Sequence, residues 1–423
     1  MPIIIERPEA AISDQELREA LQQTLSGRNL KKVLLLPPDL TRLHSGAGRI
    51  TQLCYQLLSP DCQVDIMPAL GTHDAMTEAE CRLFFGPDIP WSSFIAHRWK
   101  TDVVKIGEVP ADFIRTVSEG RIDEALQIEI NRRLLDPQYD LILSIGQVVP
   151  HEVVGMANYS KNILVGCGGR TAINQSHFLG AVYGLERLMG RDHSPVRQVF
   201  DYAEEHFLSR LPLEYILTVT TLQEQTVNLE GLYIGRDRSL FEQAVKLSQA
   251  RNFIHLDREP KKMVVYLDER EFRSTWLGNK AVYRTRMAIA DGGELLILAP
   301  GVKKFGEDPE IDALLRRYGY VGRDQILDLY QAHEDLRSNP SAAAHLIHGS
   351  SDGRFTITYA VRHLSRKAVE KAGYQYASLD DMLKRYDPDH LKPGYNQLPD
   401  GEEIYFISNP AVGLWASRQR LAH

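Results

Sequence analysis

Short runs of Val, Ile and Leu recur along the chain, separated by longer segments in which apolar residues stand three or four apart. Several of the short runs are almost continuously apolar, which is typical of strands buried on both faces of a parallel or mixed sheet. On this pattern the sequence predicts strands at 31–37, 63–68, 140–147, 216–221, 263–267, 294–299 and 403–407.

The segments between these strands carry helix signals. Ser13 and Glu16, and likewise Thr77 and Glu80, have the spacing of a capping box, in which the hydroxyl accepts a hydrogen bond from the N3 amide. Apolar periodicity predicts further helices at 122–134, 196–211, 240–253, 324–336 and 379–385. Strands that alternate with helices indicate an α/β protein, as in a doubly wound sheet.

A polar stretch with a proline at 255–262 separates a predicted helix from a predicted strand. It divides the chain into an N-terminal domain, 1–257, and a C-terminal domain, 258–423, both of ordinary domain size. We therefore expect two α/β domains with mainly parallel or mixed sheets. We also expect an active-site cleft between the domains, a place where ligands commonly bind.

Composition narrows the class of protein. The chain has 423 residues and a formal net charge of −7, which gives no electrostatic reason to expect a nucleic acid or a membrane surface as partner. The first residues lack the basic and apolar regions of a signal peptide, and the longest apolar runs are too short to cross a bilayer. The four cysteines match neither a metal motif nor a disulfide framework, so we expect reduced thiols in a cytoplasmic protein.

Two segments that follow predicted strands carry chemically capable side chains. Asp39, Thr41 and Arg42 come just after the strand at 31–37 and are suited to hold ribose hydroxyls, a phosphate or a substrate carboxylate. His73 follows a glycine turn, where a histidine can act as a general base near neutral pH. The structural alternatives are an Asp turn with an exposed Arg and a turn histidine bonded to the backbone.

The segment 143–177 is the densest in such residues. It contains His151, Lys161 and His177 among several glycines and small polar residues. Glycines allow the backbone to approach a bound phosphate, a lysine can bind that phosphate or serve as a covalent attachment point, and His177 can ligate a metal. The glycines equally fit ordinary turns, and their run matches neither a P-loop nor a Rossmann pattern, so it is the density of the segment that favours a functional site.

A fourth segment lies early in the C-terminal domain. Trp276, Lys280, Arg284 and Arg286 precede a glycine pair at 292–293. The three cationic side chains are suited to reach a substrate anion across the cleft. A solvated basic helix face is an equally good interpretation.

In order and spacing, these segments resemble the nickel-dependent lactate racemase family, the 2-hydroxyacid racemases and epimerases. Asp-Leu-Thr-Arg at 39–42 is similar to that family's Asp-x-Thr-Arg motif, and Leu-Gly-Thr-His at 70–73 to its Thr-Gly-x-His turn. His151, Lys161 and His177 keep the family's spacing of a histidine, a lysine and a second histidine. Lys280 with the glycine pair at 292–293 resembles the family's second-domain lysine and glycines, so the resemblance spans nearly the whole chain.

The sequence departs from the family's pattern at three places. The Phe-Ser-Gly-Gly-Gly/Ala run before the lysine is replaced by Met-Ala-Asn-Tyr-Ser at 156–160, so the phosphate contacts differ in detail. Trp276 stands where lactate-specific relatives carry Tyr, and an acidic Gly-x-Gly run becomes a segment with Lys303 and Lys304. These departures leave the identity of the 2-hydroxy acid open.

The resemblance implies a cofactor and a role for each residue. The cofactor is a nickel-pincer nucleotide, pyridinium-3-thioamide-5-thiocarboxylate mononucleotide, whose carbon and two sulfurs bind nickel. Lys161 would form the covalent thioamide link to it, and His177 would be the protein's nickel ligand. His73 and His151 would flank the substrate as alternating acid and base. The binding residues would be Asp39, Thr41, Asn158 and Ser160 for the cofactor, and Arg42, Lys280 and Trp276 for the substrate.

The expected function is that of an isomerase, which inverts C2 of a small 2-hydroxy acid by hydride transfer to and from the cofactor through a 2-keto acid. Two bases on opposite faces are needed because the planar ketone receives hydride on either face. Cofactor-synthesis enzymes are expected as transient partners. Three alternatives stay open: an aldonate (gluconate-type) 2-epimerase with a longer polar pocket from Asn158, Tyr159, Lys303 and Lys304, a zinc hydrolase built on His73, His151 and His177, and a non-catalytic nucleotide-binding protein.

Overall fold

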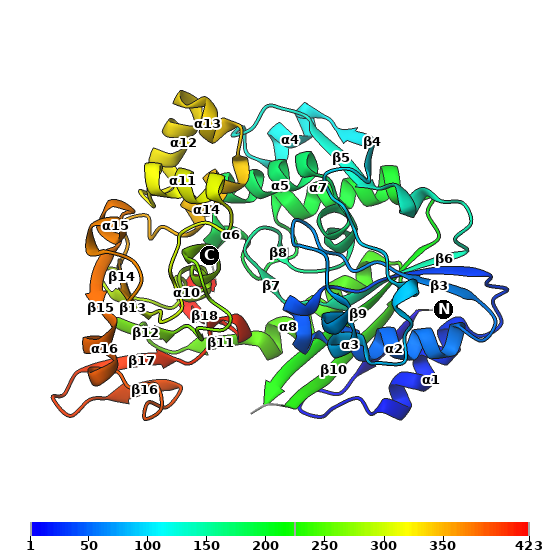
Figure 1. The fold of residues 1–423 in the computed structure, drawn as a ribbon, viewed down its shortest axis with the longest axis horizontal. Coiled ribbons are helices and arrows are strands. Elements are labelled where there is room, and N and C mark those ends of the chain that lie inside the picture. Colours follow the sequence, from blue (N-terminus) through cyan, green and yellow to red (C-terminus); the bar gives the residue numbers. More distant parts are fainter. Residues whose placement is uncertain (1, 224–225, 422–423) are drawn as a thin grey trace. The chain divides into compact units, whose positions relative to one another are not determined.

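The computed structural model describes residues 2–223 and 226–421, which form two compact units (Figure 1). The N-terminal unit contains the described residues up to Leu179 together with Leu188–Asn252. The C-terminal unit contains Gly180–Arg187 and the described residues from Phe253 onward. The boundary at 257/258 stays a prediction about domains, and the grouping of 180–187 with the C-terminal unit has no signal in the sequence.

A six-stranded mixed sheet forms the centre of the N-terminal unit. Its strand order is β1-β10-β9-β6-β2-β3, in which β9, β6, β2 and β3 are parallel and β10 is antiparallel to both of its neighbours. The four strands predicted at 31–37, 63–68, 140–147 and 216–221 are confirmed. The bounds are β1 (Ile3–Glu6), β2 (Lys32–Leu36), β3 (Gln63–Ile66), β6 (Leu141–Gln147), β9 (Leu213–Gln223) and β10 (Thr226–Gly235).

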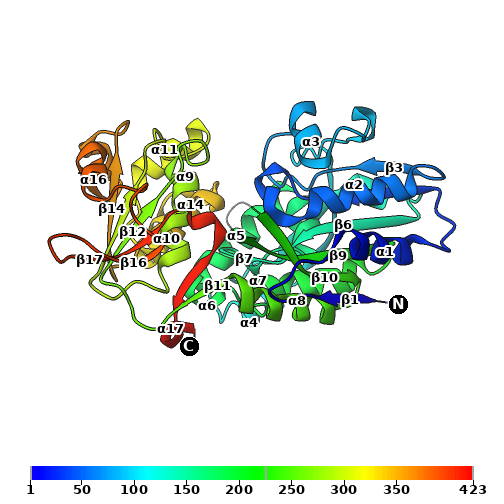
Figure 2. The same cartoon turned by 90° about the horizontal axis from the view of Figure 1, so that it is seen from below.

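Side chains of this sheet alternate between two apolar cores, one on each face. On β2, Val33 and Leu35 enter one core, and Leu34 and Leu36 enter the other. Because β2 and β6 are buried on both faces, their sequences are almost continuously apolar. The first face is covered by α1 (Asp14–Leu25), α2 (Ala47–Leu58) and α3 (Glu78–Phe85), and the second by α7 (Pro195–Ala203) and α8 (Arg238–Asn252) (Figure 2).

Both predicted capping boxes form. The amide of Glu16 donates to Ser13 Oγ over 3.2 Å, and the Glu16 carboxylate accepts from the Ser13 amide over 3.0 Å. Thr77 and Glu80 make the same pair of bonds at the start of α3. These bonds satisfy amides that the helix itself leaves unpaired, which is why α1 and α3 begin where the sequence predicts. The predicted helices at 196–211 and 240–253 are confirmed as α7, with a π-helical turn at Glu204–Leu208, and as α8.

The helix predicted at 122–134 is wrong. Residues 126–131 form strand β5 (Leu126–Asn131), antiparallel to β4 (Val103–Val109). Apolar residues at 122, 126, 130 and 134 fit a helical period, but the buried residues 126, 128 and 130 fit the period of a strand. Pairing with β4 decides between these periods, because it satisfies the backbone of β5 while the apolar side of the strand enters the core.

Shorter elements complete the N-terminal unit. Helix α5 (Arg170–Tyr183) begins in this unit, and its last turn and α6 (Leu185–Leu188) reach the segment that groups with the C-terminal unit. The other elements are η1 (Leu40–Ser45), η2 (Trp91–Ser93), α4 (Ala111–Val117), η3 (Arg132–Leu135), β7 (Pro150–His151), β8 (Gly155–Met156) and η4 (Asn162–Gly166).

The C-terminal unit is built on a second six-stranded sheet. Its order is β15-β14-β13-β12-β17-β16, and all neighbours are parallel except β16, which is antiparallel to β17. The strands predicted at 263–267, 294–299 and 403–407 are confirmed. The bounds are β12 (Lys262–Tyr266), β13 (Glu294–Leu298), β14 (Thr356–Val361), β15 (Gln375–Ser378), β16 (Gly394–Gln397) and β17 (Glu403–Ile407), with a separate parallel pair of β11 (Phe253–Leu256) and β18 (Leu414–Ser417).

Helices flank this sheet. The helix predicted at 324–336 is confirmed but breaks at His333, whose extended backbone separates two helices. The helix predicted at 379–385 is confirmed as α16. The bounds are α9 (Thr275–Gly278), α10 (Lys280–Thr285), α11 (Pro309–Tyr318), α12 (Arg323–Ala332), α13 (Glu334–Arg337), α14 (Pro340–His348), α15 (Arg366–Lys371), α16 (Leu379–Arg385), η6 (Pro410–Val412) and α17 (Arg418–Leu421).

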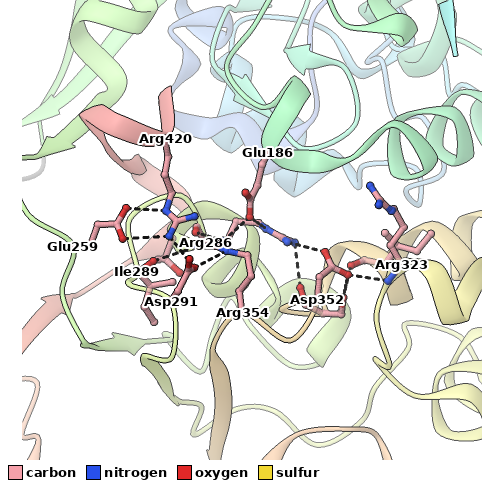
Figure 3. Close-up of polar contacts among 12 residues, drawn as sticks. Glu186, Glu259, Arg286, Ile289, Asp291, Arg323, Asp352, Arg354 and Arg420 are labelled. Carbon is pink, nitrogen blue, oxygen red and sulfur yellow. Dashed lines mark hydrogen bonds and ion pairs between the residues drawn. The ribbon is translucent and has the colours of Figure 1, made fainter. Parts of the chain in front are cut away.

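An ion-pair network fixes the segment 180–187 within the C-terminal unit (Figure 3). The Glu186 carboxylate accepts hydrogen bonds from Arg286 over 2.9 Å and from Arg354 over 2.6 Å. Asp291 joins Arg354 to Arg420 of α17, at 2.9 and 2.8 Å. Since the Arg286 side chain is only 5% exposed, its paired charge is a structural element of this unit.

All four cysteines are free thiols. Among the described residues, no helix combines the length and the apolar character that crossing a membrane requires.

Candidate active site

Three parallel strands of the N-terminal sheet end at one edge, and a predicted site residue follows each of them. Asp39 follows β2, His73 follows β3 and His151 follows β6. In parallel α/β sheets, ligands bind beyond this carboxyl edge. The topology therefore brings together residues that lie far apart in the sequence.

Asp39 orients His73. One carboxylate oxygen of Asp39 accepts from the amide and the hydroxyl of Thr41, over 3.1 and 2.5 Å, which caps η1. The other oxygen accepts from Nδ1 of His73 over 2.5 Å. Burial alone would raise the pKa of the Asp39 carboxyl, but the hydrogen bond and charge of His73 and the two bonds from Thr41 lower it below its usual value. An ionised Asp39 thus fixes the His73 ring, and Nε2 is left for proton transfer.

His151 lies in a two-residue strand, β7, which pairs with β8 in a tight hairpin. The side chain is buried, and its Nδ1 accepts the amide of Val153 over 3.2 Å. Burial lowers the pKa of His151 well below its usual value. The charge of Glu152 opposes this change, and the nearby cationic groups Lys161 and Arg42 add to it. His151 is therefore a neutral imidazole whose proton resides on Nε2.

The same electrostatic contacts show which predicted residues the fold brings together. The charge of Arg42 acts on both His151 and Lys161, and that of Asp39 acts on Lys161. Arg42 is half-buried and lies at a kink of η1, with φ −112° and ψ 38°. The turn after β2 and the segment around Lys161 therefore share one electrostatic environment.

Lys161 stands at the start of the π-helical turn η4 and is half-buried. Burial, aided by the charge of Arg42 and opposed by Glu152 and Asp39, lowers the pKa of its amine from 10.5 to about 8. A lysine with a lowered pKa has a larger fraction of its amine in the neutral form at neutral pH. The neutral amine is the nucleophilic form.

The lowered pKa of the Lys161 amine can be tested in the apoprotein. Acetylation of its amine should reach half its maximum rate near pH 8, because the protonated ammonium below that pH does not react and the neutral amine above it does. Competitive labelling with acetic anhydride, read by mass spectrometry of the Lys161 peptide, measures this midpoint. The exposed Lys31 serves as the reference in the same samples. A midpoint for Lys161 at or above that of Lys31 would contradict the burial of this amine.

His177 lies on α5 and has one ring nitrogen available. Its Nδ1 donates to the carbonyl of Ile173 over 2.7 Å, which leaves the Nε2 lone pair as an acceptor. Burial lowers the pKa of His177 to about 4, so the ring is neutral. A neutral imidazole whose other nitrogen is held by a backbone carbonyl is the usual form of a histidine metal ligand. The donor chemistry of His177 and Lys161 therefore fits the cofactor that the resemblance implies.

The glycines before α5 serve packing. A Cβ on Gly168 would lie 2.0 Å from the carbonyl oxygen of Leu164, and one on Gly169 would lie 2.4 Å from the Glu129 carboxylate. That carboxylate accepts the amide of Thr171 over 3.0 Å. At the start of α5 the Glu129 carboxylate takes the place that an anion would occupy, which favours the interpretation of these glycines as turn and packing residues.

Comparison with known proteins places this constellation in a family. Residues 6–185 match the family model described as the lactate racemase N-terminal domain. The N-terminal part of the chain belongs to the lactate racemase family. Asp39, His73, His151, Lys161 and His177 all lie within this lactate racemase N-terminal domain.

Two solved structures share the fold over nearly the whole chain. A protein from Thermotoga maritima superposes with a TM-score of 0.82 at 22% sequence identity, covering 97% of this chain and 99% of that one. The lactate racemase apoprotein from Thermoanaerobacterium thermosaccharolyticum superposes with a TM-score of 0.71 at 15% identity, covering 97% of this chain and 94% of that one. These likenesses establish the α/β fold. A comparison with curated protein sequences finds no match.

The two remaining cofactor residues predicted in the lactate racemase N-terminal domain are buried. Asn158 accepts the amide of Tyr159 through its side chain over 2.7 Å. Ser160 is fully buried, and its hydroxyl accepts a hydrogen bond from Arg197 over 2.9 Å. Both side chains thus shape the loop before Lys161, and direct contact with a cofactor stays a prediction.

The predicted substrate residues Trp276 and Lys280 belong to the C-terminal unit, outside the matched domain. The Trp276 indole stacks on the imidazole of His345 at 4.2 Å between ring centroids, and its amide donates to the carbonyl of Phe305 over 2.9 Å. The Lys280 ammonium lies over the Phe272 ring, 5.7 Å from its centroid. Their roles toward a substrate stay predictions.

The neighbouring arginines do not form the solvated basic face that was one interpretation of this segment. Arg284 and Arg286 are buried, so the solvated basic face is wrong. Arg286 pairs with Glu186 and with Asp352, each at 2.9 Å, which makes it part of the structural network of Figure 3.

Sequence reasoning missed the residues that hold the site in place. Asn162 donates to the carbonyl of Leu36 and to the hydroxyl of Ser144, both over 3.0 Å, and so ties η4 to the ends of β2 and β6. In the sequence, only its position beside Lys161 could have indicated this role of Asn162. Glu129 was hidden by the wrong helix at 122–134, and Arg197 by its place in an otherwise amphipathic helix.

Within residues 2–223 and 226–421, no group of three or more His, Cys, Asp or Glu side chains is arranged to hold a metal ion.

Proposed function

We propose that this protein is a racemase or epimerase that inverts C2 of a small 2-hydroxy acid with a nickel-pincer nucleotide as cofactor. The observation that carries the proposal is that two groups able to bind the cofactor, the His177 imidazole and the Lys161 amine, share one buried environment. His177 presents a neutral Nε2, and Lys161 presents an amine with a lowered pKa. Membership of the N-terminal part in the lactate racemase family supports an isomerase of this class.

Lys161 and His177 would hold the cofactor, Lys161 through a covalent thioamide and His177 through nickel. When bound, the nickel-pincer nucleotide supplies an acceptor and donor of the substrate's α-hydrogen as hydride. The protein's own contribution is to bind the substrate and to manage the proton of its hydroxyl group.

The two catalytic histidines are set in complementary protonation states. His73 holds its proton on Nδ1 against Asp39, so its Nε2 lone pair can accept the hydroxyl proton of the substrate. His151 accepts at Nδ1, so its Nε2 carries a proton that can be donated to the oxygen of a carbonyl. For inversion in the opposite direction the two residues exchange these roles, so that direction starts with a proton on Nε2 of His73 and a lone pair on Nε2 of His151. One histidine on each face of a planar 2-keto acid is what inversion at C2 requires.

Arg42 is the candidate for the substrate carboxylate in the N-terminal unit, with Lys280 and Trp276 as candidates from the C-terminal unit. A guanidinium binds a carboxylate through two parallel hydrogen bonds, which fixes the orientation of the substrate. The charge of Arg42 acts on His151, which places the anion-binding group near the proposed acid.

A small substrate fits better than an aldonate. Three of the four residues expected to lengthen the pocket are already engaged within their own units. Asn158 and Tyr159 are buried, and the Lys304 ammonium donates to the carbonyl of Glu307 over 2.7 Å. We therefore propose a short 2-hydroxy acid as the substrate.

The experiment is to produce the chain together with the cofactor-synthesis enzymes and to measure three quantities. Intact mass and peptide mapping report any adduct on Lys161, metal analysis reports nickel, and chiral chromatography reports inversion of lactate, longer 2-hydroxy acids, malate and gluconate. We expect an adduct, nickel, and inversion of a short acid. Absence of an adduct would remove the covalent link only, whereas absence of nickel and of C2 inversion together would overturn the proposed function.

A further inference from the structure

The turn before Lys161 holds two residues in backbone conformations that normally favour glycine. Asn158 has φ 66° and Tyr159 has φ 56°, both in the left-handed region. Asparagine tolerates this region because of its short polar side chain, but for tyrosine it is a strained conformation. Strain of this kind persists only where surrounding contacts hold it in place.

The contacts of the Tyr159 side chain provide part of this stabilisation. Its ring packs on Tyr215 and Phe241, with centroid separations of 4.4 and 5.3 Å. Its hydroxyl donates to the carbonyl of Arg236 over 3.1 Å. The side chain is thereby anchored in the core, although the backbone of the turn needs partners of its own.

Arg197 of α7 provides those partners. Its side chain is fully buried, and its guanidinium lies 4.4 Å from the centre of the Phe241 ring. It donates to the carbonyls of Met156 and Asn158, over 2.7 and 3.2 Å, and to the hydroxyl of Ser160 over 2.9 Å. One rigid, planar group thus binds three successive parts of the turn, which a flexible ammonium cannot do.

The two neighbours of Lys161 are therefore fixed from opposite sides. Ser160 is held by Arg197, and Asn162 is held by Leu36 and Ser144 at the ends of two sheet strands. The backbone of Lys161 has no freedom to shift between them, so the path of its side chain is set before any cofactor arrives.

We propose that Arg197 is a positioning residue that holds the strained turn 156–160 and thereby places the Lys161 amine for cofactor attachment. The attachment part rests on the proposed function, whereas the holding of the turn does not. Arg197 acts through the backbone of the turn and through Ser160, and it needs no contact with substrate.

Two variants of Arg197 and one control test this role. Arg197→Met keeps the length and packing of the side chain but removes all three donors. Arg197→Lys keeps the charge and can replace only part of them. Arg238→Met is the matched control, because Arg238 lies over the same Phe241 ring, 5.0 Å from its centre, but pairs with Asp192 and Asp201 instead of the turn.

Hydrogen exchange of the apoprotein measures how firmly the turn is held, and it needs no cofactor. In Arg197→Met we expect amide exchange across 156–161 to increase about tenfold or more, since the turn loses its partners, while β2 and β6 keep their protection. Arg197→Lys should lie between Arg197→Met and the unchanged chain, and Arg238→Met should leave this peptide unchanged. Unchanged exchange at 156–161 in Arg197→Met would overturn the proposal, as would equal loss of protection throughout the unit, which marks a general effect on folding.

Co-production with the cofactor-synthesis enzymes gives the second readout, the fraction of folded protein with an adduct on Lys161. We expect this fraction to fall in Arg197→Met, to recover partly in Arg197→Lys and to stay unchanged in Arg238→Met. A full adduct on Arg197→Met would overturn the positioning role. If the unchanged chain itself carries no adduct, the proposed covalent link fails, and the exchange experiment still decides whether Arg197 holds the turn.

Discussion

Replacing His177 with alanine should reduce nickel in the purified protein to background and lower C2 inversion by more than about 100-fold. The reason is that His177 is the proposed protein ligand, and even the outer partners of metal ligands contribute about 10- to 100-fold to metal affinity or activity. The fold should survive, because the substitution removes a hydrogen bond that His177 makes to a carbonyl of its own helix, that of Ile173. Nickel is measured per folded protein by elemental analysis, and inversion by chiral chromatography.

The control for this change is His193→Ala. His193 belongs to the same unit, and its side chain is 79% exposed beside Asp192, so its loss should change neither nickel nor activity. Wild-type nickel content in His177→Ala would show that the metal, if present, is bound elsewhere.

Replacing His73 or His151, the two proposed catalytic histidines, with asparagine should lower the rate of C2 inversion by about 10²- to 10⁴-fold. This is the usual contribution of a positioned acid or base. For a true racemase the equilibrium constant is one by symmetry, so kcat/KM for both enantiomers must fall by the same factor in each variant. Asparagine keeps a polar side chain of similar size, but it cannot take up the hydroxyl proton. Initial rates from each pure enantiomer measure the effect.

The two variants should differ in a single turnover. His151→Asn retains His73, whose Nε2 lone pair can accept the hydroxyl proton, so it should still yield 2-keto acid from one enantiomer. In His73→Asn the remaining His151 can act as base once its proton has moved from Nε2 to Nδ1 and the bond from the Val153 amide is given up, so it should yield 2-keto acid from the opposite enantiomer. Rapid quenching and derivatisation of the keto acid separate these cases. Keto acid from the same enantiomer in both variants would contradict the placement of the histidines on opposite faces.

A helix or strand could be predicted from the sequence where the interactions that form it are local. The strands at 31–37 and 140–147 were predictable because burial on both faces requires almost continuous apolar sequence. Helices α1 and α3 were predictable because their capping boxes act within a single turn. The segment 122–134 was not predictable, because its apolar residues fit two periods and only pairing with β4 selects the strand.

The same distinction holds for the site. The spacing of His151, Lys161 and His177 could be recognised in the sequence because the motif is linear. The pairing of Asp39 with His73 could not, because it depends on β2 and β3 lying side by side and parallel. The protonation states of the two histidines likewise depend on which ring nitrogen finds a partner in the folded chain, Asp39 for His73 and the Val153 amide for His151.

The sequence by itself determined the class of fold and the set of candidate site residues, because apolar periods and linear motifs are local properties of the chain. The tertiary structure alone decided what supports those residues. A buried arginine on α7 holds the turn before Lys161, an asparagine ties the turn after it to two strands, and a glutamate on β5 caps the helix of His177. The hydrogen bonds that they make join residues between 18 and 126 positions apart in the chain. Long-range hydrogen bonds of this kind are fixed only when the sheet and its helices pack, since no local pattern in the sequence encodes them.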